Sequence, residues 1–140
     1  MSVSFDGQQG LVVVRTQVSG PSGIAVVGLA LDTGATRTLV NVSLLVAIGY
    51  DPAATLERTE VTTCSGVEFA ALVSLGKIVA LGRELADFPV LAHTLPPSAG
   101  VDGVLGLDFL RGQLLTIDFL NGRLILAEPP NAADLGGRST

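Results

Sequence analysis

The chain has 140 residues, of which 48% are hydrophobic and 15% are charged, and this suits one domain with a core of its own. Its net charge is -5 and its Lys and Arg residues form no cluster, which removes the electrostatic basis for binding nucleic acid. A single cysteine and a single histidine exclude an internal disulfide framework and the usual zinc or iron–sulfur sites, so we expect no metal and no other cofactor.

The two ends of the chain are more polar than its middle. The first ten residues, MSVSFDGQQG, have neither the positive region nor the apolar region of a signal peptide. The longest apolar stretches fall far short of the ~20 residues that span a bilayer. We therefore expect a cytoplasmic protein without a membrane partner, with one domain over residues 1–128 and a flexible tail over residues 129–140.

Short apolar runs separated by glycine predict strands from residue 11 onward. Residues 11–20 alternate imperfectly and end in the turn sequence SGPSG. Residues 23–31, GIAVVGLAL, are almost wholly apolar, which is typical of a central strand buried on both faces. We expect these two strands to pair.

A short strand and a short helix should follow. Residues 36–41, TRTLVN, predict the strand. Asn41 can cap a two-turn helix over residues 42–48, and Gly49 can end it.

The pattern changes over residues 56–81, where Val, Phe and Leu alternate with polar residues on both sides of the sequence CSG. This predicts two strands around a Ser-Gly turn. The arm that carries Thr59, Glu60 and Glu68 is too polar for a core, so the hairpin tip should project into solvent and move, as many lids do.

The last third of the chain predicts three strands and a short helix. Residues 87–95 form a strand that two prolines end, and Gly106 and Gly112 bracket one or two turns of helix. The sequence FLNGR marks a tight hairpin between strands near residues 113–118 and 123–126.

A carboxylate follows directly on the apolar run that ends at Leu31. An unpaired carboxylate costs several kcal/mol to desolvate there, so either a turn satisfies Asp32 or a reaction needs it. The first alternative is an Asx-turn or a helix N-cap. In favour of the second, Thr33 offers a hydroxyl and Gly34 permits a close backbone approach.

With its surroundings, this segment resembles the retropepsin-like aspartic proteases, the single-lobed relatives of pepsin. ALDTGATRTLV resembles their active-site turn, TTCSGVEFA stands where they have a flap hairpin, and DGVLGLDFLRGQLLTIDFLNGRLIL resembles their closing segment. The last is similar to the cellular and bacterial branch, which includes the DNA-damage-inducible ubiquitin-shuttle proteins. The resemblance implies an all-β fold, a small closed barrel with a flap hairpin and one or two short helices, active as a homodimer.

The chemistry of this family needs two carboxylates about 3 Å apart that share one proton, and the chain has one candidate. The resemblance therefore implies a partner that is a second copy of the chain, and an extended peptide or unfolded protein as substrate, cleaved on the acid side of neutral pH next to hydrophobic residues. Residues 2–5 or 124–127 could join the two copies. The catalytic residues it implies are Asp32, Thr33 and Gly34, and the substrate-binding residues are Ala35, Thr36, Thr63, Cys64, Ser65, Gly66, Val67, Val104 and Leu105.

The chain departs from the retroviral pattern in two places. Retroviral members carry an acidic residue soon after the Asp-Thr-Gly-Ala turn, where this chain has Thr36 and Arg37, so a substrate contact made by that carboxylate is absent. The expected flap tip also reads Cys64-Ser65-Gly66 in place of several glycines.

Other polar residues have simpler interpretations. Asp108 stands early in a short helix, where a carboxylate is favourable, rather than in a catalytic role. Asp102 and Asp118 suit turns or strand ends, and His93 has no cysteine, serine motif or second ligand with which to act as a catalyst. Cys64 is either a small exposed turn residue or, if two flap tips meet, the site of an oxidative cross-link.

Two functions of different kinds stay open at this point. The first is a homodimeric aspartic endopeptidase. The alternative is a retropepsin-like module that keeps the fold for dimerisation or peptide binding without turnover. An intact Asp32-Thr33-Gly34 favours the enzyme. A metal-dependent hydrolase is excluded because the chain has only one histidine and no clustered acidic residues.

Overall fold

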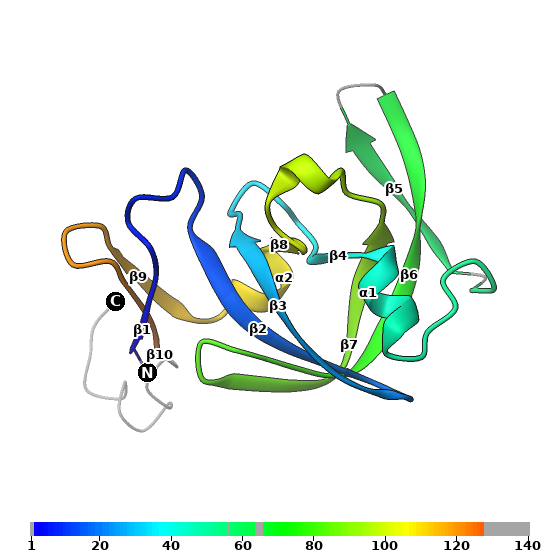
Figure 1. Cartoon of the computed structure of the whole chain (residues 1–140), viewed down its shortest axis with the longest axis horizontal. Coiled ribbons are helices and arrows are strands. Elements are labelled where there is room, and N and C mark those ends of the chain that lie inside the picture. Colours follow the sequence, from blue (N-terminus) through cyan, green and yellow to red (C-terminus); the bar gives the residue numbers. More distant parts are fainter. Residues whose placement is uncertain (1, 56, 64–65, 128–140) are drawn as a thin grey trace, which may run out of the picture.

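A computed structural model describes residues 2–55, 57–63 and 66–127. The described chain is mostly β, with two short α-helices (Figure 1). This confirms the predicted all-β class. The elements in chain order are β1 (Ser2–Ser4), β2 (Val13–Gly20), β3 (Gly23–Leu31), β4 (Leu39–Asn41), α1 (Val42–Ala47), β5 (Arg58–Thr63), β6 (Gly66–Ala80), β7 (Arg83–His93), a 3-10 turn (Pro97–Ala99), β8 (Gly103–Leu105), α2 (Leu107–Leu110), β9 (Leu114–Asp118) and β10 (Arg123–Ala127).

The larger sheet closes into a barrel. Its strand order is β2-β3-β8-β4-β7-β6-β5, and β2 also pairs with β6 over Thr16–Ser19, which returns the sheet to its first strand. The apolar side chains inside the barrel are fully buried, among them Leu29, Leu75 and Ile78. Closure leaves β5 as an edge strand outside the ring.

The hairpin of β2 and β3 confirms the predicted pairing, with Gly20 opposite Gly23 across the turn. The expectation that residues 23–31 are buried on both faces is wrong for the first half of the strand. Ile24 and Val26 are 63% and 55% exposed, whereas Leu29 is fully buried. The reason is that β3 gains a neighbour on its second side, β8, only from Leu29 onward.

Strand β8 passes between β3 and β4, parallel to β3 and antiparallel to β4. This crossing brings a segment near the C-terminus next to the end of β3, where Asp32 follows. It requires a glycine, because a Cβ added at Gly103 would overlap the backbone carbonyl of Leu39. Gly28 and Asp102 fix the entry to the crossing, since the Gly28 N–H donates to the Asp102 carboxylate at 2.8 Å.

Helix α1 has the ends that its sequence predicts. The Asn41 side chain accepts a hydrogen bond from the Ser43 N–H at 3.3 Å, which is N-capping. Gly49 has a φ of 104°, a left-handed region that favours glycine just past a helix end. Helix α2 lies between Gly106 and Gly112, also as predicted.

Strands β5 and β6 form the predicted hairpin, which projects from the barrel (Figure 1). The expected tip residues Cys64 and Ser65 lie outside the described residues. Strand β6 is one strand of 15 residues, whose first part pairs with β5 and whose last ten residues, all but Gly76, pair with β7. The β6–β7 connection has only Leu81 and Gly82, both with positive φ, so β7 begins at Arg83, four residues earlier than predicted.

The predicted hairpin around FLNGR is present as β9 and β10, and β1 pairs with β10 to complete a second, three-stranded sheet. The two terminal segments that could join two copies therefore pair with each other within one chain. Asp118 accepts hydrogen bonds from the Asn121 side chain and from the backbone N–H groups of Asn121 and Leu120, which lower its pKa and confirm it as a turn residue. The described part of the chain holds no helix with the length and hydrophobicity to cross a membrane.

Gly103→Ala should lower the free energy of unfolding by about 3 kcal/mol, because the added methyl group forces β8 away from β4. Urea unfolding followed by circular dichroism measures this change. The matched control is Gly10→Ala, since a Cβ at Gly10 meets nothing within 4 Å. Equal stability of the two variants would contradict the close crossing.

Candidate functional site

Asp32 stands at the end of β3 and is held by its own backbone. Its N–H donates to the Leu105 carbonyl of β8 at 3.0 Å, and its carbonyl accepts from the Ala35 N–H at 3.2 Å. One carboxylate oxygen, Oδ1, accepts from the Gly34 N–H at 2.8 Å. The Asx-turn that the sequence allows for Asp32 is therefore present, and it satisfies this oxygen. The described residues offer the other oxygen, Oδ2, no hydrogen bond, so a turn alone does not account for the carboxylate.

The turn that follows is tied to α2 by a second carboxylate. Asp108 accepts two bonds from Thr38, one from its N–H at 2.9 Å and one from its hydroxyl at 2.7 Å. The same hydroxyl accepts from the Gly106 N–H at 3.1 Å, so the buried Thr38 side chain is fully satisfied. Asp108 therefore bridges two segments, which is more than the helix-end role that the sequence predicts for it.

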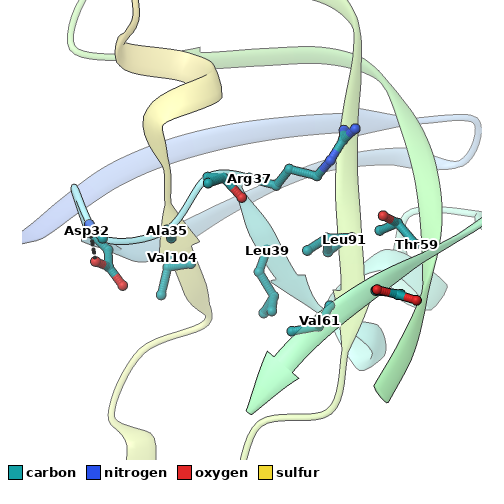
Figure 2. Close-up of a pocket in the computed structure, with 11 residues that line it drawn as sticks. Asp32, Ala35, Arg37, Leu39, Thr59, Val61, Leu91 and Val104 are labelled. Atoms are coloured by element: carbon teal, nitrogen blue, oxygen red, sulfur yellow. Dashed lines mark hydrogen bonds between the residues drawn. The ribbon is translucent and has the colours of Figure 1, made fainter. Parts of the chain in front are cut away.

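An open cleft of about 500 Å³ lies beside Asp32 (Figure 2). The turn after β3 forms one side, β5 of the hairpin forms the opposite side, and single residues of β4, β7 and β8 form the floor. Most of the lining side chains near the floor are apolar. The lining residues are Asp32, Gly34, Ala35, Thr36, Arg37, Leu39, Thr59, Glu60, Val61, Leu91 and Val104.

The cleft brings together five of the residues that the sequence singles out. They are Asp32, Gly34, Ala35, Thr36 and Val104. Thr33 is exposed on the same turn but does not line the cleft. Leu105, expected in a pocket wall, is instead fully buried in the core, and its contribution is the backbone carbonyl that accepts from Asp32.

The hairpin reaches the cleft through β5 and not through the described part of β6. Val61 pairs with Glu68, and Thr62 pairs with Val67. Paired residues share a face of a sheet and successive residues alternate, so Val67 lies on the face opposite to Val61. Val67 is accordingly exposed and outside the cleft, as is Gly66, which begins β6. Thr63 ends β5, and Cys64 and Ser65 lie outside the described residues.

Six lining residues are not among the site residues that the sequence predicts. Leu39 and Leu91 come together because β4 and β7 pair in parallel, and no turn connects those strands directly. Arg37 is noticed in the sequence only as a departure from the retroviral pattern. The remaining three are consecutive residues on one arm of the expected hairpin. The alternation of side chains along this arm does not show which face of it is turned toward the cleft. The six are Arg37, Leu39, Thr59, Glu60, Val61 and Leu91.

In the part of the chain that the structure describes, three charged residues line the cleft: Asp32, Arg37 and Glu60. Within the described ranges, no group of three or more acidic, histidine or cysteine side chains could hold a metal ion. His93 lies just outside, at the end of β7, and its Nε2 is 3.0 Å from the Glu68 carboxylate on β6. That hydrogen bond, together with the Thr94 carbonyl at Nδ1, raises the pKa of His93.

Comparison with known proteins gives one family. A family model described as aspartyl protease matches residues 14–109. Among solved structures, the chain is similar to a retropepsin-like aspartic protease from Rickettsia conorii, with a TM-score of 0.67 and 20% sequence identity over 90% of this chain and 88% of that one. At this identity the likeness concerns the fold. No curated protein sequence matches the chain.

Glu68→Gln should lower the pKa of His93 toward 6.5, because the anionic partner of the imidazolium is lost. His93 is the chain's single histidine, so an NMR titration of its ring protons gives one curve. Glu84→Gln is the control, since Glu84 pairs with Lys77 elsewhere on the same two strands. A titration curve unmoved by Glu68→Gln would contradict the pair.

The sign of the linked stability change follows from the raised pKa. Protonated His93 stabilises the fold below pH 6.5, and this contribution is lost as the pH rises through the folded-state pKa. Both side chains are partly exposed, so the contribution amounts to a few tenths of a kcal/mol, about the size of a surface ion pair.

Proposed function

The chain belongs to the aspartyl protease family, and from this premise we propose that two copies of it assemble one active site, to which each supplies Asp32. It is an aspartic peptide hydrolase with a retropepsin-like fold. One observation carries the proposal: a half-buried carboxylate borders an open cleft, and among the described residues one of its oxygens has no hydrogen bond and no second aspartate lines that cleft. The chemistry requires two carboxylates about 3 Å apart, which share one proton because both cannot ionise at that distance.

In the assembled pair, the ionised Asp32 takes a proton from a water held between the carboxylates, and the water oxygen attacks the scissile carbonyl carbon. The protonated Asp32 of the other copy gives its proton to the carbonyl oxygen, which yields a tetrahedral diol. The second carboxylate then removes a proton from the diol while the first protonates the amide nitrogen, and the C–N bond breaks. One water has been added, and the pair again holds one proton.

Thr33 and Gly34 support this pair in different ways. The Gly34 N–H bonded to Oδ1 orients the Asp32 carboxylate, and a Cβ at Gly34 would lie 3.1 Å from that oxygen, so a side chain there would push the carboxylate aside by a few tenths of an ångström. The exposed Thr33 hydroxyl is free to bond across to the second copy beneath the carboxylates, as the family resemblance implies.

The cleft suits an extended peptide with apolar side chains. Strand β5 is an edge strand, whose free N–H and C=O groups can pair with a substrate backbone. Thr36 lies on the opposite side, where a bound backbone can also reach it. Five apolar residues between these sides favour hydrophobic residues at the cleaved bond: Ala35, Leu39, Val61, Leu91 and Val104.

The β1-β10-β9 sheet is the surface that best fits a second copy. Its outer face and hairpin turn expose Leu114, Phe119 and Leu120, the last at 91%. Burying apolar side chains of this size contributes about 1.5–3 kcal/mol each. Among the described strands, both edges of this sheet, β1 and β9, have no further neighbour and can pair with another chain.

Asp32→Asn should abolish cleavage of unfolded casein at every pH between about 3.5 and 7.5, whereas the wild type should be most active on the acid side, where the two carboxylates share a proton. Asp51→Asn, a change at an exposed loop residue, is the control. Excess Asp32→Asn protein should also suppress wild-type activity, because mixed dimers hold one carboxylate. A stable dimer without cleavage at any pH would instead favour the silent peptide-binding module.

Leu114→Glu should lower the mass of the protein in solution from dimer to monomer and lower the specific activity in parallel, since it places a charge on the proposed contact surface. Light scattering with activity measured on the same fractions tests this. Ile24→Glu changes an equally exposed apolar residue on β3 and should leave the mass unchanged. An intact dimer in Leu114→Glu would rule out this surface.

A further inference from the structure

Arg37 is a cation in the wall of the cleft without a partner of its own. Its side chain is exposed, and the described residues give it no hydrogen bond and no ion pair. Two other basic side chains do have partners: Lys77 pairs with Glu84, and Arg83 bonds the Phe109 carbonyl and lies over the Phe109 ring. Arg37 is therefore available to a ligand in the cleft.

The backbone of Arg37 is held on both sides while its side chain is not. Two residues before it, the Ala35 carbonyl accepts from the Leu107 N–H at 2.8 Å. One residue after it, Thr38 is bonded to Asp108. Gly106 packs against the Arg37 carbonyl so closely that a Cβ there would lie 2.7 Å away. The backbone of Arg37 is therefore already ordered, so a ligand that binds the guanidinium restricts only the side chain, which limits the conformational entropy lost on binding.

The direction of Arg37 separates it from the reacting atoms. Figure 2 shows its side chain running from the turn toward Leu91 and Thr59, away from Asp32. A substrate group that meets the guanidinium is therefore not at the cleaved bond but on a residue flanking it. Successive residues of an extended peptide are about 3.3 Å apart, so peptides of ordinary length reach both places.

We propose that Arg37 selects substrates that carry a carboxylate side chain, Asp or Glu, at a position flanking the cleaved bond. A guanidinium presents a planar set of N–H donors that matches a carboxylate in two parallel hydrogen bonds. This inference rests on the proposed peptidase function and adds a charge requirement to the hydrophobic preference given above. The substrate class is then a peptide with an apolar residue at the cleaved bond and an acidic residue nearby.

Two other charges face the same cleft and limit the effect. Glu60 on β5 and Asp32 both repel a substrate carboxylate, so the selectivity should be modest, about tenfold in kcat/KM. Glu60→Gln removes one of these two charges and is expected to increase the preference for an acidic peptide. The acidic residue is bound before the chemical step as well as during it, so the effect should lie mainly in KM.

The test uses a set of peptides that share one apolar cleavage site. Each peptide carries a single Glu or a single Gln, placed in turn at each of the four positions on either side of that site. At pH 6 and low salt, the wild type should prefer Glu over Gln about tenfold at one position. Arg37→Gln should bring that ratio to about one, and Arg37→Glu should favour a Lys peptide there. Arg15→Gln, which changes an exposed arginine of β2 outside the cleft, should keep the wild-type ratio. Added salt should weaken the preference.

A binding measurement distinguishes failure of this inference from failure of the proposed function. Asp32→Asn does not cleave, so fluorescence anisotropy with labelled Glu and Gln peptides measures recognition alone. A Glu/Gln ratio near one at every position, or a preference that survives in Arg37→Gln, overturns the role of Arg37 while cleavage by the wild type upholds the peptidase. Absence of cleavage by the wild type overturns the peptidase, and an Arg37-dependent affinity for the Glu peptide would still support carboxylate recognition.

Discussion

The carboxylate of Asp108 is the contact on which the shape of the cleft depends. It accepts hydrogen bonds from the N–H and the hydroxyl of Thr38, and that hydroxyl in turn accepts a hydrogen bond from the Gly106 N–H. Bonds to an ionised acceptor are about twice as strong as neutral ones, and breaking such a set would leave buried polar groups unsatisfied. Seventy positions of sequence separate Asp108 from Thr38, so this contact joins the turn after β3 to α2, a segment distant in sequence.

The turn that carries Asp32 is consequently held at both ends. At its start Asp32 bonds Leu105 of β8, and at its end Thr38 bonds Asp108. Hydrogen bonds at these two points restrain the backbone between them, whereas the side chains of Thr33, Thr36 and Arg37 are exposed. A fixed backbone with free side chains suits a site in which the reacting carboxylate must be placed closely while the surrounding residues adapt to a substrate.

Local signals predict most of the elements, and long-range pairing accounts for what they miss. The Asn41 cap and Gly49 identify α1, and Asn121-Gly122 identifies the last hairpin, because the residues that set each end are neighbours in sequence. The two-residue turn before Arg83 escapes prediction, since Leu81 adopts a positive φ that bulky residues rarely take and its burial offsets the strain. The half-exposed β3 is mistaken for a central strand because hydrophobicity alone does not show where β8 begins to pair.

The same division holds for the candidate site. Asp32 stands out because a charge after an apolar strand needs a local explanation. Leu39 and Leu91 line the cleft only through the parallel pairing of β4 and β7, and no periodicity within either strand reveals that neighbour. The register of β5 with β6 decides that Val61 and not Val67 faces inward, and this depends on a turn whose length the sequence does not specify.

The late position of β8 and α2 in the chain has a consequence for biosynthesis. A ribosome releases β3 and Asp32 well before Gly103–Leu105 and Asp108, so the nascent chain carries the aspartate without the strand and the carboxylate that position it. The unfinished polypeptide lacks the β8 residue that lines the cleft and the two strands that complete the β1-β10-β9 sheet. The structured cleft therefore arises only after translation has passed α2, and the order of synthesis separates the appearance of the aspartate from the appearance of its surroundings.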